Sequence, residues 1–303
     1  MGRIAHWTTG FVRKHVQFKS TAHAVLNFVP DFRITRSVKG VGPIRYRMRR
    51  HHYFWTRPLL DDSSNTVFGI LQTLIHSGDV VYDIGANIGL YSRIMLQWHH
   101  AGKVIAFEPM SDNVELLKEN ARLAPDPSKL LVFPTALGDR IGFEELQIDD
   151  VSSGTAVLSK VSGGQAAKVR RLRDLPPLTE LIPIWRLDDL VAQEQLPLPD
   201  VMKIDTEGAG GMVLRGAVQT IEASSPRMVI AVHGEDECRS LLEVLIPLSY
   251  YCYSWVPRDG KRIYTQIKVE DAVHFSRGEL CCSRKEADVN TPPERLRQIP
   301  QAT

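Results

Sequence analysis

The sequence VVYDIGANIG, from Val80 to Gly89, predicts a buried strand that turns tightly into a helix. Its β-branched run suits a strand buried on both faces, and Gly85 and Gly89 allow a tight turn. Such a turn brings backbone amides and a helix N-terminus close to a ligand. The spacing lacks the third glycine of the dinucleotide motif, and Asp83 stands where a pyrophosphate-binding protein avoids negative charge. The stretch therefore favours a nucleotide-like ligand that carries positive charge.

Strands and helices are expected to alternate along the chain around this stretch. Asp112 and Glu115 have the spacing of a capping box at the start of the third helix. Alternating strands and helices imply right-handed crossovers and a parallel, doubly wound α/β sheet. Residues 250–256 and 262–268 flank an Asp-Gly turn and are predicted to pair antiparallel. The predicted helices lie near residues 67–75, 88–98, 112–121, 212–223 and 236–245, and the other predicted strands at 103–107, 130–134, 201–205 and 228–232.

Two segments interrupt the alternation. Residues 140–186 are rich in Gly and Pro and contain a basic cluster at 168–173. An insertion of this length inside a compact domain predicts a hairpin or lid that faces the substrate. Residues 286–303 are polar, contain three prolines and are predicted to form a loose tail. The predicted organisation is a basic N-terminal arm or cap at 1–60, a main domain at 61–285 and the tail at 286–303.

Charge is distributed unevenly between the arm and the rest of the chain. The first 60 residues contain 12 Lys or Arg and one acid, Asp31, for a net +11, whereas the remaining residues carry a net −9. A basic arm of this kind can bind its own acidic body, an anionic membrane surface or nucleic acid. Residues 33–55 alternate basic and apolar side chains around two glycines, which predicts a short strand pair. Such a pair usually covers a neighbouring domain, so nucleic acid is not an expected partner, and peripheral membrane contact stays open.

The cysteines and the N-terminal region favour a cytoplasmic protein. Cys238, Cys252, Cys281 and Cys282 show no paired C-x-x-C spacing, so neither a zinc site nor a disulfide framework is expected. No apolar run near the start reaches the roughly 18 residues that a membrane span requires, and the first 30 residues lack the pattern of a signal peptide.

Acidic side chains follow the predicted strands at the edge where an open parallel sheet binds its ligands. Glu108 lies 19 residues beyond Gly89, the distance at which an acid accepts hydrogen bonds from ribose hydroxyls. That feature alone suits NAD equally well. Asp83 and Glu108 together, with no phosphate clamp near them, better suit S-adenosylmethionine, whose sulfonium and ammonium groups are cationic.

The ordered motifs resemble those of the FkbM-type S-adenosylmethionine-dependent methyltransferases. The resemblance implies the Rossmann-like class I methyltransferase fold, with a seven-stranded, mostly parallel, doubly wound sheet whose last strand is antiparallel. It also implies O-methylation of a small-molecule or glycan hydroxyl. The motifs that carry it are VVYDIGANIGLYS at 80–92, VIAFEPMSDNVELLKEN at 104–120, ALGD at 136–139, RLDDL at 186–190 and VMKIDTEGAGGMVLRGA at 201–217.

The resemblance also implies roles for individual residues. Asp205 and Glu207 would face the transferred methyl group. Similar proteins commonly read Glu-Gly-x-Glu, whereas this chain has Gly210 in place of the second acid. The cofactor-binding residues implied are Gly85, Asn87 and Gly89 at the methionine moiety, Glu108 at the ribose, and Asp139 or its neighbours at the adenine.

Methyl transfer requires alignment of the acceptor oxygen, the methyl carbon and sulfur, and a base that removes the hydroxyl proton. The candidates for the base are Asp205, Glu207 and His233, of which the histidine has an ordinary pKa near neutrality. No metal site is assigned, because two acids that could share a divalent cation supply too few ligands. Two other hypotheses stay open: an RNA or protein methyltransferase recruited by the basic arm, and an inactive cofactor-binding protein, which the replacement at Gly210 suggests.

Overall fold

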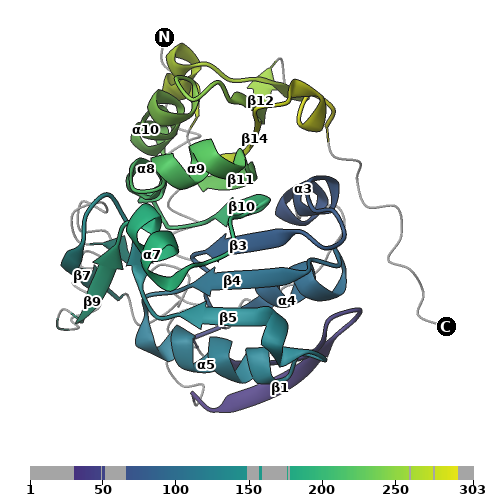
Figure 1. Ribbon diagram of the computed structural model, residues 1–303, viewed down its shortest axis with the longest axis vertical. Coiled ribbons are helices and arrows are strands. Elements are labelled where there is room, and N and C mark those ends of the chain that lie inside the picture. Colours follow the sequence, from purple (N-terminus) through teal and green to yellow (C-terminus); the bar gives the residue numbers. More distant parts are fainter. Residues whose placement is uncertain are drawn as a thin grey trace, which may run out of the picture.

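A computed structural model describes residues 31–48, 50–51, 66–148, 157–158, 176, 178–258, 261–275 and 277–292. Its centre is an eight-stranded sheet with helices on both faces (Figure 1). The strand order across this sheet is β13 (Lys261–Gln266), β12 (Tyr251–Arg258), β14 (Gly278–Ser283), β11 (Arg227–Val232), β10 (Val201–Ile204), β3 (Val80–Ile84), β4 (Lys103–Phe107) and β5 (Leu130–Phe133).

The strand directions confirm the predicted topology. The five strands from β5 to β11 are mutually parallel, and β14, the last of the sheet in the chain, is inserted antiparallel between β11 and β12. The pair on either side of the Asp-Gly sequence is antiparallel, with Arg258 opposite Lys261. All seven strands implied by the family resemblance are therefore present, and β13 adds an eighth at the edge. The fold is a Rossmann-like α/β fold.

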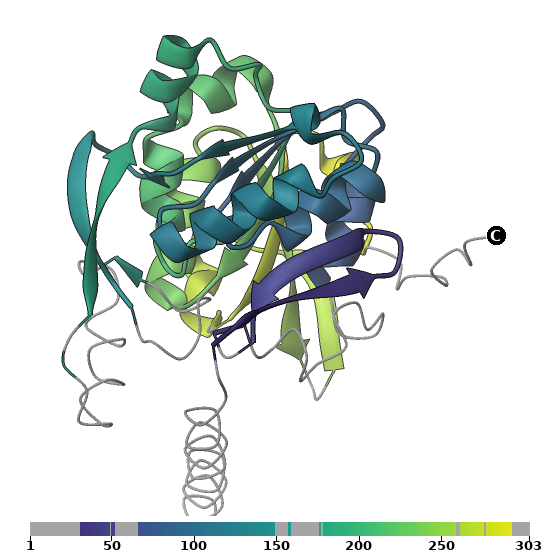
Figure 2. The same cartoon turned by 90° about the horizontal axis from the view of Figure 1, so that it is seen from below.

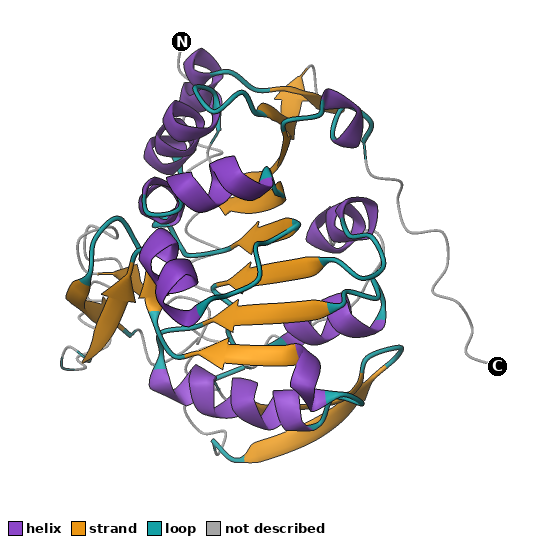
Figure 3. Cartoon of the chain, in the orientation of Figure 1, coloured by secondary structure: helices purple, strands orange, loops and turns teal. Residues whose placement is uncertain are grey.

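Two layers of helices bury the two faces of the sheet (Figure 3). Tyr82 and Ile84 of β3 pack with residues of α7 to α10, whereas Val81, which precedes Tyr82, packs with residues of α3 to α5. Because strand side chains alternate between faces, one short apolar run supplies both cores. The helices are α3 (Thr66–Leu74), α4 (Leu90–Gln97), α5 (Ser111–Arg122), α7 (Leu187–Glu194), α8 (Gly210–Arg215), α9 (Val218–Ser224) and α10 (Glu235–Leu245).

Two local predictions about the helices were wrong. Helix α5 begins at Ser111 with Met110 as its N-cap and no side-chain cap, so there is no capping box at Asp112. Asp112 instead forms an ion pair with Arg50. The helix predicted at 212–223 is divided into α8 and α9 next to Gly216. The backbone of Gly138 approaches so closely that a Cβ atom at position 216 would lie 1.9 Å from its carbonyl oxygen, so this position requires glycine.

The insertion at 140–186 contributes to a second, four-stranded sheet. Its order is β6 (Ala136–Leu137), β9 (Thr179–Trp185), β7 (Gly142–Gln147) and β8 (Val157–Leu158). Figure 1 shows β7 and β9 beyond the ends toward which the arrows of β3, β4 and β5 point. The basic cluster predicted at 168–173 lies outside the described residues.

The strand pair predicted in the basic arm is present as β1 (Arg33–Val38) and β2 (Gly42–Arg47), which lie along α5 (Figure 2). Ile44 and Tyr46 are buried in a cluster with residues of α3, α4 and α5. Arg33 forms ion pairs with Glu115 and Glu119, and Arg45 with Glu119. The described part of the arm therefore binds the acidic face of its own body.

The predicted tail is partly folded, and the N-terminal 30 residues are not described. Residues 1–30 and 52–65 lie outside the described residues. In the segment predicted to be a tail, Glu286–Asp288 form a short helix and Val289 is buried, while 293–303 lie outside the description. Within the described ranges, no helix combines the length and the apolar character needed to cross a membrane.

Candidate active site

A cavity of about 260 Å³ lies at the carboxyl ends of β3, β4 and β10, the edge predicted to bind the ligand. Apolar side chains and the second sheet form much of its wall, and three acids from the ends of β4 and β10 complete it. Leu146 of β7 comes from the insertion. Its lining also includes Gly85, Asn87, Tyr91, Phe107, Glu108, Asn113, Thr135, Ala136, Leu137, Lys203, Asp205, Thr206 and Glu207.

The turn after β3 brings the backbone to the cavity. Gly85 has φ +78°, and a Cβ atom there would lie 1.9 Å from the carbonyl oxygen of Asp205. Only glycine fits this conformation and this contact. Asn87 also has positive φ, and both residues line the cavity. Gly89 does not line it; its missing Cβ makes room for Leu117, so this glycine serves the packing of α4 on α5.

Asp83 does not face the cavity, which corrects the idea that it would meet a cationic ligand. It is fully buried, accepts a hydrogen bond of 2.6 Å from the Ser92 hydroxyl, and forms an ion pair of 3.0 Å with Lys203. Burial lowers the pKa of Lys203, but the charges of Asp83 and Asp205 outweigh it and raise the pKa above its ordinary value. The negative charge of Asp83 is thus neutralised within the protein. A lysine between Met202 and Ile204 in a buried strand was the sequence signal for this partner.

Glu108 is a buried acid whose side chain forms part of the cavity wall. It is 5% exposed and accepts hydrogen bonds from Asn87 N (2.8 Å), Met110 N (3.0 Å) and Asn113 Nδ2 (3.3 Å). Burial raises the pKa of its carboxyl to about 7, although these three donors favour the ionised form. The residue predicted to bind a ribose is therefore held in one orientation by the protein.

A histidine of the arm supports Glu108 through Asn113. His51 is fully buried, and its Nδ1 accepts a hydrogen bond of 3.1 Å from Arg47 N. Its side chain also interacts with that of Asn113, and burial lowers the pKa of His51 to about 4, so the ring is neutral near pH 7. With Nδ1 as acceptor, Nε2 carries the hydrogen and is the donor. Sequence reasoning missed both residues.

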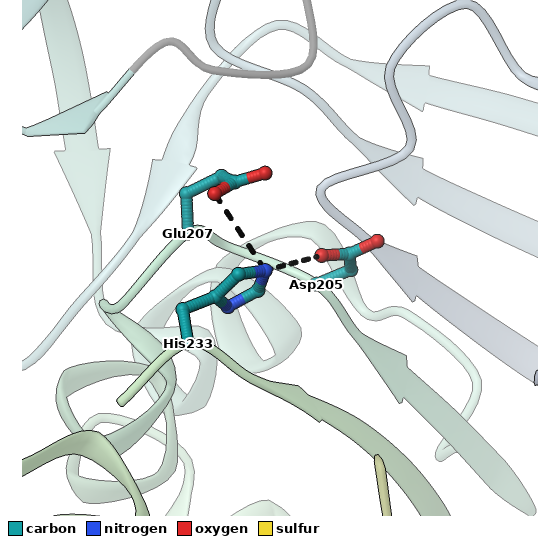
Figure 4. A group of neighbouring side chains, drawn as sticks. All are labelled: Asp205, Glu207 and His233. Atoms are coloured by element: carbon teal, nitrogen blue, oxygen red, sulfur yellow. Dashed lines mark ion pairs between the residues drawn. The ribbon is translucent and has the colours of Figure 1, made fainter. Parts of the chain in front are cut away.

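Asp205, Glu207 and His233, the three predicted catalytic residues, meet at the ends of β10 and β11 (Figure 4). His233 Nε2 lies 3.5 Å from Asp205 Oδ1 and 3.6 Å from Glu207 Oε2. Burial raises the pKa of Glu207 to about 7. Burial lowers the pKa of His233, but its hydrogen bond to Glu237 and the charges of Glu207 and Asp205 raise it above the ordinary value overall.

Glu237 of α10 orients this histidine and occupies the space next to Gly210. Its Oε2 accepts a hydrogen bond of 2.7 Å from His233 N and lies 3.3 Å from His233 Nδ1. Its Oε1 accepts one of 3.0 Å from Gly210 N. A Cβ atom at position 210 would lie 3.0 Å from that oxygen and 3.0 Å from Leu241. Where similar proteins have an acid at this position, the present chain has a glycine, and the carboxylate of Glu237 from α10 lies beside it.

Asp139 lies away from the cavity. It forms an ion pair of 3.3 Å with Arg215 and is not part of the lining. Thr135, Ala136 and Leu137, which precede it in the chain, line the cavity instead. The structure thus brings Gly85, Asn87, Glu108, Asp205 and Glu207 to one cavity, with His233 beside the last two.

Comparisons with known proteins agree with the predicted family. The family model of the methyltransferase FkbM domain matches residues 83–251. The chain is 27% identical over 181 residues to hexuronic acid methyltransferase AglP of Haloferax volcanii, covering 59% of this chain and 66% of that protein. It is 28% identical over 180 residues to 31-O-demethyl-FK506 methyltransferase FkbM of Streptomyces tacrolimicus, covering 54% and 68%.

A methyltransferase FkbM of Methylobacillus flagellatus, known from a crystal structure, aligns with a TM-score of 0.41 at 17% identity, covering 70% of this chain and 47% of that one. The match thus spans just under two thirds of AglP and about half of the crystallised protein. The family model itself covers more than half of the present chain and includes all three strand ends that form the cavity. The chain belongs to the FkbM-domain family of methyltransferases.

Proposed function

We propose that the chain uses S-adenosylmethionine to methylate a hydroxyl group of a glycan or a small hydroxylated molecule. The observation that carries the proposal is Glu108, a buried carboxylate on the cavity wall. A carboxylate has about four acceptor sites, of which Asn87 N, Met110 N and Asn113 Nδ2 use three. At least one site of Oε2 stays available to a ribose hydroxyl.

The charges around the cavity also suit this cofactor better than one with phosphate groups. Lys203 is the only basic side chain among the described lining residues, and it forms an ion pair with Asp83. A pyrophosphate would lack a basic partner there, whereas a cationic ligand would have Asp205 and Glu207. When bound, S-adenosylmethionine supplies an electrophilic methyl group on a sulfonium sulfur. Gly85, Asn87 and Glu108 would hold it, with Phe107 and Leu137 supplying apolar surface.

The chain's own residues supply the groups that methyl transfer to a hydroxyl needs. Asp205, Glu207 and His233 lie together beside the cavity, where one of them can take the proton that the hydroxyl loses as its oxygen bonds to the methyl carbon. Two similar proteins are named for a hexuronic acid and for 31-O-demethyl-FK506 as acceptors. The second name supports a hydroxyl acceptor for this chain, and a hexuronic acid carries hydroxyls as well as a carboxylate.

The test is methyl transfer from labelled S-adenosylmethionine to a panel of hydroxylated acceptors, including hexuronic acid glycosides, with RNA and protein acceptors alongside. We expect label in at least one hydroxylated compound, and loss of that label when Asp205 is replaced by Asn. Label confined to RNA or protein would contradict the proposal and favour recruitment by the basic arm.

The affinity for S-adenosylhomocysteine is expected to rise between pH 6 and pH 8. The pKa of Glu108 is about 7, so its carboxyl is largely protonated at pH 6 and ionised at pH 8. Only the ionised form offers all its lone pairs to a ribose hydroxyl, so affinity should rise by up to about tenfold per pH unit below 7 and level off above it. Calorimetry across this range measures the effect. The Glu108→Gln variant should give a flat profile, and an equally steep one would assign the pH dependence to another group.

Replacement of His51 by Leu is expected to weaken S-adenosylhomocysteine binding by about 0.5 to 1.5 kcal/mol, because Asn113 loses a partner that fixes its amide toward Glu108. Thermal denaturation should accompany the binding titration. A purely structural role would lower the melting temperature and leave the affinity of the folded protein unchanged. His51→Gln, which keeps a donor, should recover part of the affinity.

A further inference from the structure

The three side chains in Figure 4 have the spacing of metal ligands. His233 Nε2 is 3.5 Å from Asp205 Oδ1 and 3.6 Å from Glu207 Oε2, and one ligand atom of each residue lies within 4.8 Å of the others. Oxygen and nitrogen ligands lie about 2.0 to 2.6 Å from a divalent cation, so neighbouring ligands are about 3 to 4 Å apart. Both separations measured from the histidine fall within this range.

The orientation of His233 is a second, independent observation. Its Nδ1 lies 3.3 Å from Glu237 Oε2, and Glu237 is itself held by the backbone amides of His233 and Gly210. A hydrogen on Nδ1 then leaves Nε2 facing two carboxylates, an arrangement that either a proton on Nε2 or a cation between the three groups stabilises. Histidines that bind metals usually donate their other N–H to a carboxylate in this way.

The positive charges nearby do not neutralise the cluster. Lys203 Nζ lies 4.0 Å from Asp205 Oδ2 but 3.0 Å from Asp83 Oδ1, so its charge mainly compensates that of Asp83. Arg277 is exposed and acts on Glu207 through its charge. Both carboxylates are also partly exposed, at 39% and 28% of their side chains, so an ion from solvent can reach them.

We propose that Asp205, Glu207 and His233 bind one divalent cation of the Mg²⁺ and Mn²⁺ class at the acceptor side of the cavity. The two carboxylate oxygens, with open positions for water, favour these hard ions, whereas an imidazole nitrogen by itself suits zinc, copper, iron or nickel. Three protein ligands leave about three octahedral positions for other oxygen atoms. If the acceptor is a sugar, as in the proposed function on which this step rests, its reacting hydroxyl and a neighbouring hydroxyl or carboxylate can occupy two of these positions. The cation would then polarise that hydroxyl and lower its pKa, and the proton that it loses would pass to a neighbouring side chain or to water.

The test is titration of the chelator-treated, full-length chain with Mn²⁺, in which the electron paramagnetic resonance signal reports the free ion. We expect one ion per chain. His233→Gln and Glu207→Gln should each weaken binding by at least about tenfold, and Glu237→Gln should weaken it by about 10- to 100-fold through loss of orientation. Glu222→Gln removes an exposed acid of α9 and should leave binding unchanged.

Two results would overturn the cation site: no bound Mn²⁺ in the wild-type chain at millimolar ion, or equal affinity in the wild type and the ligand variants. Thermal denaturation verifies that each variant is folded, and Glu207, in a partly exposed loop, provides the variant whose folding is least at risk. Binding of S-adenosylhomocysteine in the presence of chelator separates the two proposals. Cofactor binding without Mn²⁺ binding rejects the cation alone, whereas Mn²⁺ binding without cofactor binding rejects the proposed function alone.

Discussion

Replacement of Lys203 by Met is expected to lower the free energy of unfolding by about 3 to 5 kcal/mol, the usual cost of removing one partner of a buried ion pair. The lysine side chain is 4% exposed, and Asp83, which is fully buried, would keep a negative charge with Ser92 as its remaining side-chain donor among the described residues. Lys203 stands opposite Asp83 in the pairing of β10 with β3, at the centre of the sheet. Urea denaturation followed by circular dichroism measures the loss.

A double variant identifies the cause of that loss. Asp83→Asn with Lys203→Met removes both charges and keeps an acceptor for the Ser92 hydroxyl, so most of the stability should return. Lys118→Met on α5 serves as a control, because this exposed lysine should change stability by no more than about 0.5 kcal/mol. A Lys203→Met variant as stable as this control would show that the ion pair does not stabilise the sheet.

Replacement of Glu108 by Ala is expected to weaken S-adenosylhomocysteine binding by about 1.5 to 3 kcal/mol for each ribose hydroxyl that the carboxylate accepts, roughly 10- to 150-fold per contact. The variant also removes the acceptor that orients the amides of Asn87 and Met110 at the cavity wall. Because Glu108 is buried without a cationic partner among its hydrogen-bond donors, its removal should not by itself unfold the protein. Fluorescence or calorimetric titration measures the change.

Glu108→Gln is the matched variant for this prediction, because it keeps the shape of the side chain and loses the charge. It should bind S-adenosylhomocysteine more weakly than the wild type and more tightly than Glu108→Ala. Glu222→Gln, on the surface of α9, controls for loss of one negative charge. Unchanged affinity in Glu108→Ala would remove Glu108 from the cofactor site.

The sheet and most strand ends could be predicted because they depend on local sequence patterns. Val80 to Ile84 and the later apolar runs are short, continuous and bounded by turn residues, which is typical of parallel strands buried on both faces. Since parallel strands end at one edge, the positions of Glu108, Asp205 and His233 beyond those runs indicated a common site. The strand at Thr179–Trp185, where Ile182 and Ile184 are buried, was not assigned individually, because it lies within the glycine- and proline-rich insertion.

The interactions that could not be predicted join residues far apart in the chain. Lys203 reaches Asp83 across 120 residues, and Glu237 reaches Gly210 from another helix. His51 lies in the arm and supports Glu108 through Asn113, a link that depends on how β2 packs against α5. The break next to Gly216 likewise depends on the approach of Gly138, which no local pattern reveals. The parts of the site that the sequence did not predict are therefore the side-chain contacts between elements that lie far apart in the chain.

The central claim is that the cavity beyond β3, β4 and β10 binds S-adenosylmethionine. Titration calorimetry of the full chain with S-adenosylhomocysteine, and separately with NAD, tests it most directly. Both ligands carry ribose hydroxyls that could donate a hydrogen bond to Glu108, but only NAD carries a pyrophosphate. We predict binding of S-adenosylhomocysteine at one site per chain and no measurable heat with NAD. Binding of NAD without binding of S-adenosylhomocysteine would contradict the account.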